Sequence, residues 1–135
     1  MTLNEWLDHI AKVHPRQIEL GLDRIKKVAG TLSLGKPATR VVTIAGTNGK
    51  GSCVAYLESL LELAGFSTCA YTSPHIHQFN ERIRVRSVAV DDLLICRAFI
   101  EIEKARGTTS LSYFEYATLA ALWIFSQNSL DFAIL

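Results

Sequence analysis

A glycine-rich segment with one lysine contains the residue types most able to do chemistry. It consists of Gly46, Thr47, Asn48, Gly49, Lys50, Gly51 and Ser52, and it follows the β-branched run Val41–Ile44. In such a loop, backbone N–H groups converge on phosphate oxygens and the start of the following helix adds partial positive charge. A lysine at this place reaches the β- and γ-phosphates of a nucleotide. The segment therefore predicts a site for a nucleoside triphosphate, with Lys50 stabilising negative charge.

This segment departs from the standard phosphate loop, G-x-x-x-x-G-K-[ST], at two positions. Gly51 stands where the standard loop has the hydroxyl residue that ligates Mg²⁺, and Ile44 stands where it has its first glycine. Ser52 comes one residue later, and one residue along a helix turns a side chain by about 100°. We therefore expect another hydroxyl, and not that of Ser52, to supply the metal ligand.

Ser73 is the candidate for that hydroxyl. It lies in the segment Thr72–His75, which follows a predicted strand over residues 67–72. Ligands of open α/β sheets bind beyond the carboxyl ends of the strands, and we expect this strand to lie next to the phosphate loop. A serine after a strand is more often a turn former, but the displaced hydroxyl favours a metal ligand. Because Mg²⁺ prefers octahedral oxygen ligation, one serine also needs carboxylate or water ligands.

Hydrophobic spacing, caps and turn residues predict alternating helices and strands. The predicted helices cover residues 3–14, 22–32, 52–64, 92–105 and 112–127, and the predicted strands cover residues 40–45, 67–72, 83–85, 88–90 and 131–135. The strand, loop, helix and strand over residues 40–72 form a βαβ crossover, which makes its two strands parallel. The predicted fold class is α/β: a P-loop-type, doubly wound and mostly parallel sheet flanked by helices. The strand at residues 131–135 stops without a turn, which suggests a truncated chain.

Composition limits the classes of partner. The chain has 135 residues, 49% of them hydrophobic, and a net charge of +1. This length fits one domain or part of one, and mixed charges without a basic stripe argue against nucleic acid and acidic membrane as partners. Cys53, Cys69 and Cys96 lack metal-ligand spacing and are expected to be reduced core thiols. With no signal segment and no apolar run of ~18 residues, we expect a soluble, cytoplasmic monomer.

Three motifs in register resemble the folylpolyglutamate synthase and dihydrofolate synthase family of the Mur ligase superfamily. They are Ala45–Ser52, Tyr71–His75 and Phe79–Val85, and the segments Leu20–Leu22 and Ser112–Glu115 extend the resemblance over almost the whole chain. The Leu20–Arg24 segment looks most like the bacterial bifunctional enzymes. The resemblance implies that residues 1–135 form the N-terminal part of the ATP-binding domain, an incomplete Mur-ligase-like central domain. By the same resemblance, we expect the family's C-terminal glutamate-binding domain to be absent from this chain.

The resemblance implies an ATP-dependent ligase that joins a pteroate or folate carboxylate to L-glutamate through an acyl phosphate. Residues 46–52 would hold the ATP phosphates, Lys50 would offset charge on the transferring group, and Ser73 would ligate Mg²⁺. A monovalent cation is a further candidate cofactor. The family's other metal ligands, a glutamate and a histidine, and its carbamylated lysine would lie beyond Leu135. The chain alone is therefore expected to bind nucleotide without completing the reaction.

For the pterin end of the substrate, the resemblance points to two segments. They are Glu19, Leu20, Gly21 and Leu22, and Ser112, Tyr113, Phe114 and Glu115. Each has a structural explanation as well, because the first suits a turn between helices and the second has the S-x-x-E form of a capping box. His75 and Arg82 are expected to be solvated and are left outside the site.

Three other functions remain possible from the sequence. One is a Mur-type ligase that acts on a cell-wall precursor or peptide with the same acyl-phosphate chemistry. A second is a P-loop GTPase or kinase, against which the displaced hydroxyl and the missing Asn-Lys-x-Asp string both argue. The third is a nucleotide-binding fragment with no activity.

Overall fold

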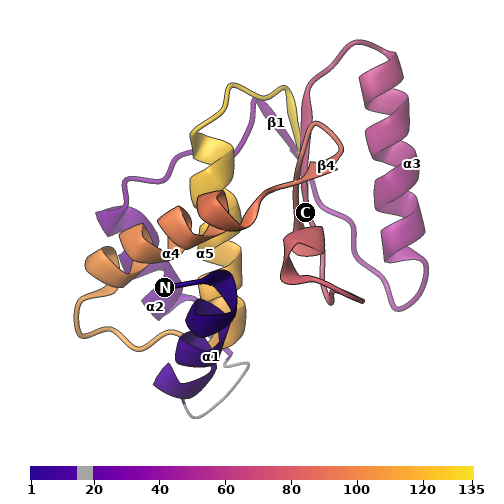
Figure 1. Cartoon of the computed structure of the whole chain (residues 1–135). Helices are drawn as coiled ribbons and strands as arrows, with labels where there is room; N and C mark the ends of the chain where they lie inside the picture. The colour runs from indigo at the N-terminus through magenta and orange to yellow at the C-terminus, as the bar shows by residue number, and fades with distance from the viewer. Residues whose placement is uncertain (15–19) are drawn as a thin grey trace. The chain divides into compact units, whose positions relative to one another are not determined.

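The computed structural model describes residues 1–14 and 20–135, which fall into two compact units. The first unit comprises Met1–Gly35 and Asp91–Ile124, and the second comprises Lys36–Val90 and Phe125–Leu135. Glu19, one of the predicted pterin contacts, lies outside the described residues. The second unit carries the sheet and the phosphate loop, and the first is built of helices (Figure 1).

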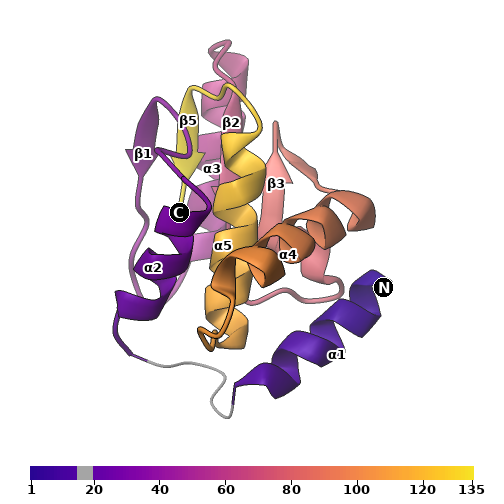
Figure 2. The ribbon, with the colours of Figure 1, turned by 90° about the vertical axis from the view of Figure 1, so that its left-hand side faces the viewer.

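The second unit is built on a five-stranded mixed sheet. Its strands are β1 (Arg40–Val42), β2 (Thr68–Tyr71), β3 (Ile83–Val85), β4 (Val88–Ala89) and β5 (Phe132–Ile134), in the order β1-β5-β2-β3-β4. Strand β5 pairs in parallel with β1 and with β2, whereas the β3–β4 hairpin adds to β2 in antiparallel fashion. Figure 2 shows β1, β5, β2 and β3 side by side. The predicted α/β class is confirmed, and the short strands predicted at residues 83–85 and 88–90 pair with each other, but two of the four strand pairs are antiparallel, so the sheet is mixed and not mostly parallel.

The position of β5 corrects one expectation. Phe132 pairs with Arg40 of β1 on one side and with Thr68 of β2 on the other, so the strand that leads to Ser73 does not neighbour the strand that leads to the phosphate loop. A βαβ crossover makes its two strands parallel but leaves room for a strand between them. The Ile44 N–H donates to Leu135 O (2.7 Å), so the phosphate loop starts beside the end of β5.

Helix α3 (Lys50–Leu63) follows the phosphate loop and packs on β2. Its buried Val54 contacts a small core with Ala70 of β2 and Ile134 of β5. The helix begins two residues before the predicted start, because Gly49 already adopts the left-handed N-cap position (φ 76°). It ends at Leu63, and Gly65 (φ 89°) adopts the left-handed conformation that glycine often takes just after a helix.

The first unit consists of helices, some of them with side-chain caps and with aromatic rings in contact between them. They are α1 (Leu3–Val13), α2 (Asp23–Thr31), α4 (Asp92–Arg106) and α5 (Tyr113–Ser126), whose last two residues belong to the second unit. Helices α1 and α2 both contact α4. The Ser112 N–H donates to Glu115 Oε1 (2.9 Å) and the Glu115 N–H donates to Ser112 Oγ (3.2 Å), so the predicted capping box of α5 is confirmed. Asp91 caps α4 by accepting from the Leu94 N–H.

The three cysteines are free thiols in different surroundings. Cys69 is buried in β2, and burial raises the pKa of its thiol to about 12. Cys96 is half-buried, whereas Cys53 is exposed on α3, so the expectation of a core thiol was wrong for Cys53. Among residues 1–14 and 20–135, no helix has the length and apolar character that a membrane span requires.

Candidate functional site

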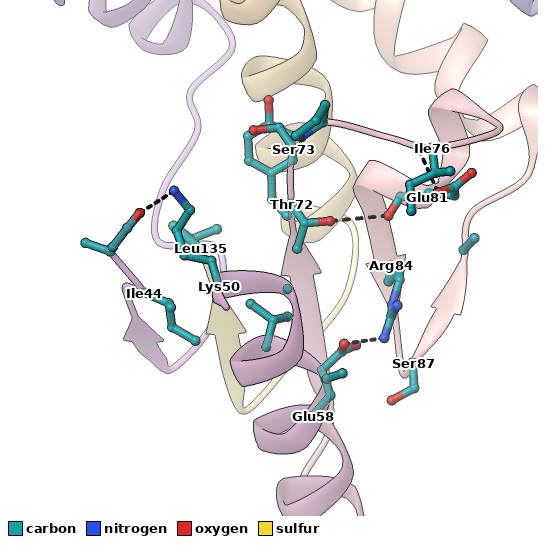
Figure 3. Close-up of a pocket in the computed structure, with 18 residues that line it drawn as sticks. Ile44, Lys50, Glu58, Thr72, Ser73, Ile76, Glu81, Arg84, Ser87 and Leu135 are labelled. Carbon is teal, nitrogen blue, oxygen red and sulfur yellow. Dashed lines mark hydrogen bonds and ion pairs between the residues drawn. The ribbon is translucent and has the colours of Figure 1, made fainter. Parts of the chain in front are cut away.

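An open cavity of about 640 Å³ in the second unit brings the phosphate loop and the segment after β2 together (Figure 3). Gly46, Lys50 and Gly51 line it from the loop side, and Thr72 and Ser73 line it from the end of β2. The two segments therefore share a cavity although β5 separates their strands, because the carboxyl ends of parallel strands meet at one edge of a sheet.

The backbone of the phosphate loop suits an anion. The first intrahelical bond of α3 runs from the Cys53 N–H to Gly49 O (3.0 Å), so the N–H groups of Lys50, Gly51 and Ser52 have no partner within the helix. Only glycine adopts the left-handed conformation of residue 49 without strain, and that conformation turns the chain from the loop into the helix. Unpaired N–H groups at a helix start form an anion site.

Lys50 supplies the positive charge of this loop. Its side chain is exposed, and its Nζ donates to Gly46 O at 2.5 Å, so the ammonium lies across the mouth of the loop. A phosphate bound there can replace this weaker neutral acceptor with a charged one. Among the other predicted loop residues, Thr47, Asn48, Gly49 and Ser52 are exposed and lie outside the lining of the cavity.

The hydroxyl positions agree with the reasoning from the sequence, although the metal itself stays a prediction. Ser73 is exposed and lines the cavity, whereas Ser52 does not line it. A Cβ atom added at Gly51 would meet no atom within 4 Å, so space is open where the standard loop carries its hydroxyl. The described residues contain no group of three or more His, Cys, Asp or Glu able to hold a metal. Ser73 therefore presents one hydroxyl oxygen at the cavity, and oxygen is the ligand atom that a hard cation prefers.

A buried ion pair, which sequence reasoning missed, lies across the same cavity. Glu58 of α3 accepts from Arg84 Nη2 of β3; the Glu58 side chain is 1% exposed and the Arg84 side chain 35%. Burial raises the pKa of Glu58, and the Arg84 guanidinium lowers it by less. Helical spacing was the available signal, because Glu58 lies four residues after the buried Val54.

A second missed residue, Glu81, also lines the cavity. It belongs to the 3₁₀ helix η1 (Phe79–Arg82), where the sequence pattern predicted neither a helix nor a strand. Its carboxylate accepts hydrogen bonds from the N–H groups of Ile76, His77 and Gln78, and these bonds lower its pKa to about 2.

His75 and Arg82 are not the solvated side chains that were expected. Arg82 Nε donates to His75 Nδ1 (2.8 Å), and the Arg82 guanidinium lies 5.5 Å from the centre of the Phe79 ring. Both side chains therefore help to hold the segment that follows Ser73.

The residues predicted to contact a pterin lie in the first unit. Leu20 and Leu22 are 94% and 60% exposed, Gly21 adopts φ 108°, and Phe114 is 40% exposed. Tyr113 is half-buried, while Ser112 and Glu115 are buried in the cap of α5. Arg24 Nη2 donates to Glu115 Oε1 (2.9 Å) and so joins the start of α2 to that cap. Arg24 lies two residues after the first predicted segment, so this bond links the chain next to that segment with the second one.

No protein-family model matches the chain. The sequence is 47% identical over 133 residues to the dihydrofolate synthase/folylpolyglutamate synthase of Escherichia coli (strain K12), a match that covers 98% of this chain and 32% of that protein. The structure of Escherichia coli FolC in complex with DHPP and ADP superposes with a TM-score of 0.97 at 46% identity, covering 100% of this chain and 33% of the other.

A second organism gives the same result. The bifunctional folylpolyglutamate synthase/dihydrofolate synthase of Yersinia pestis, complexed with AMPPNP and Mn ion, superposes with a TM-score of 0.95 at 43% identity, covering 100% of this chain and 33% of the other. The chain thus spans about a third of the length of the relatives it matches. Over its whole length, this chain is a homologue of the dihydrofolate synthase/folylpolyglutamate synthases.

Proposed function

We propose that residues 1–135 supply the nucleotide-binding part of an ATP-dependent acid–amino-acid ligase of folate biosynthesis. The reaction joins the carboxylate of a pteroate or folate to the amino group of L-glutamate. The observation that carries this proposal is the shared cavity of Lys50 and Ser73. It is supported by relatives whose structures contain ADP, or AMPPNP with Mn ion.

In the proposed reaction, a carboxylate oxygen of the pteroate or folate attacks the γ-phosphorus of ATP, and ADP leaves. The glutamate nitrogen then attacks the acyl carbon of the acyl phosphate, loses a proton, and inorganic phosphate leaves. Lys50 and the N–H groups at the start of α3 stabilise negative charge on the phosphates during the first step. Mg²⁺, when bound, neutralises phosphate charge, and the Ser73 hydroxyl is the ligand that this chain offers it.

We assign the pterin end of the substrate to the exposed side chains of Leu20, Leu22 and Phe114. Their exposed apolar side chains suit a flat aromatic ring, while the Arg24–Glu115 ion pair holds the two segments together. Net charge +1 without a basic stripe supports a small-molecule enzyme with no nucleic-acid or membrane partner. We further propose a cytoplasmic monomer.

The first test measures AMPPNP binding to the protein with Mg²⁺ by calorimetry. Lys50→Ala should weaken binding about tenfold or more, because it removes a charged hydrogen bond to phosphate. Unfolding stability should stay within about 0.5 kcal/mol, since Lys50 is exposed. Lys36→Ala, at another exposed lysine of the same unit, is the matched control and should bind normally. Equal affinity in Lys50→Ala would refute the role of this loop.

The second test separates the folate reaction from its nearest alternative. It uses the longest natural polypeptide that contains residues 1–135 and measures ADP release. We expect release with dihydropteroate and L-glutamate, and none with a muramyl precursor and an amino acid. Release only with the muramyl precursor would show a cell-wall ligase, and binding without release in either mixture would show a nucleotide-binding protein.

A further inference from the structure

The segment that carries Ser73 is tied at both ends to helix η1. Before Ser73, the Thr72 N–H donates to Arg82 O at 2.9 Å. After Ser73, three successive N–H groups donate to the side chain of Glu81: Ile76 to Oε2 at 3.1 Å, and His77 and Gln78 to Oε1 at 2.7 and 2.6 Å. One carboxylate therefore closes the loop in which Ser73 lies (Figure 3).

These bonds are of the strong kind. A carboxylate that accepts from backbone N–H groups makes charge-assisted hydrogen bonds, which are shorter and about twice as strong as neutral ones. The same bonds hold the pKa of Glu81 near 2, so the carboxylate is ionised at neutral pH. Because Ser73 is exposed, contacts of its own side chain do little to fix its position, and the loop backbone must do so.

We propose that Glu81 is a positioning residue for Ser73: its carboxylate fixes the backbone of residues 76–78 and thereby keeps the Ser73 hydroxyl at the cavity that Lys50 also lines. This inference rests on the proposed role of Ser73 in binding the metal. Partners that orient metal ligands typically change metal affinity by about 10- to 100-fold when they are removed.

A direct bond from Glu81 to the metal is the competing explanation, since Glu81 also lines the cavity. Both of its oxygens already accept from backbone N–H groups, and a metal bond would compete with these. The two explanations differ in one measurable respect. A positioning residue acts only through Ser73, so its substitution adds nothing once the Ser73 hydroxyl is gone, whereas a direct ligand contributes independently.

The experiment measures AMPPNP affinity of the protein with Mg²⁺ and with EDTA, and the ratio of the two affinities is the gain due to metal. Glu81→Gln should lower this gain about tenfold while leaving the affinity in EDTA within about twofold. Ser73→Ala should lower it similarly, and the double variant should equal Ser73→Ala. Glu101→Gln, at a carboxylate on α4 whose side chain is 42% exposed, is the matched control and should keep the full gain.

A general loss of structure would weaken binding in EDTA as well, and circular dichroism would show it. If Glu81→Gln is unfolded, Glu81→Asp keeps the charge and should show the same selective loss, to a smaller extent. An unchanged gain in the Glu81 variants would overturn the inference and leave the proposed function intact. The same holds if the gain in the double variant falls by the two single-variant factors multiplied together. Absence of any gain in the natural protein, or a full gain in Ser73→Ala, would overturn the metal-binding role of Ser73 and the inference with it.

Discussion

Replacing Arg84 with methionine should leave the buried Glu58 carboxylate without its partner and destabilise the fold in a pH-dependent way. Breaking a fully buried ion pair by removing one partner costs about 3–5 kcal/mol. Here the carboxylate is 1% exposed but the guanidinium is 35% exposed, so water screens part of the attraction. We therefore expect a loss of about 2 kcal/mol in the free energy of unfolding near neutral pH.

The direction of the pH dependence follows from the pKa of Glu58. Burial raises this pKa above the ordinary value of 4.5, and the charge of Glu62 acts in the same direction, whereas Arg84 lowers it. The folded protein therefore holds the proton on Glu58 more tightly than the unfolded chain does. The stability that the protonated Glu58 contributes is fully present below about pH 4.5, and it is lost as the pH rises through the pKa of Glu58 in the folded protein. Without Arg84 the folded pKa rises further, so Arg84→Met should cost more at about pH 8 than at about pH 5.

Urea unfolding followed by circular dichroism at both pH values gives the measurement. Replacing both partners, Glu58→Leu with Arg84→Met, should recover most of the lost stability, because no buried charge then lacks a partner. A single variant as stable as the natural protein at both pH values, or a double variant no more stable than the single one, would refute this account of the pair.

Three further predictions concern local features. Gly51→Ser places a hydroxyl where the standard loop has one and where space is open. In a Ser73→Ala background it should restore the metal-dependent gain in AMPPNP affinity. No recovery would contradict the explanation that Ser73 replaces the hydroxyl missing at residue 51. Arg86 and Ser87 adopt φ 51° and 64° in the β3–β4 turn, a conformation that Asn followed by Gly adopts more easily. Arg86→Asn with Ser87→Gly should therefore raise the free energy of unfolding by about 1 kcal/mol in urea titrations, and a decrease would count against that turn geometry. Ser112→Ala should lower it by about 1 kcal/mol through loss of the α5 cap, and unchanged stability would show that the cap contributes little.

Features set by nearby residues were predictable from the sequence. The capping box of Ser112 and Glu115, the left-handed Gly65 and the strand–loop–helix pattern around Lys50 all depend on contacts within a few positions. Lys50 and Ser73 also line one cavity, as expected, because parallel strands place their carboxyl ends at one edge of a sheet.

Features that join distant segments were not predictable. The position of β5 between β1 and β2 depends on pairing between strands that are far apart in the sequence, and the spacing of hydrophobic residues within each strand does not show which strands pair. Glu58 falls inside the predicted helix over residues 52–64, and nothing in the spacing of that helix identifies its partner, because Arg84 lies on another element. Glu81 lies in the motif Phe79–Val85, but its bonds to three backbone N–H groups form only once the segment is folded.

The central place of β5 has a consequence for how the sheet assembles. Strands β1 and β2 share no backbone bonds with each other and meet only through residues 132–134. During synthesis, the parallel part of the sheet must therefore wait until nearly all of the described chain has emerged, and its loop-closure entropy is high. We infer that β1, and the edge of β2 that does not pair with β3, remain unpaired until then, which makes newly made, incomplete chains prone to aggregation.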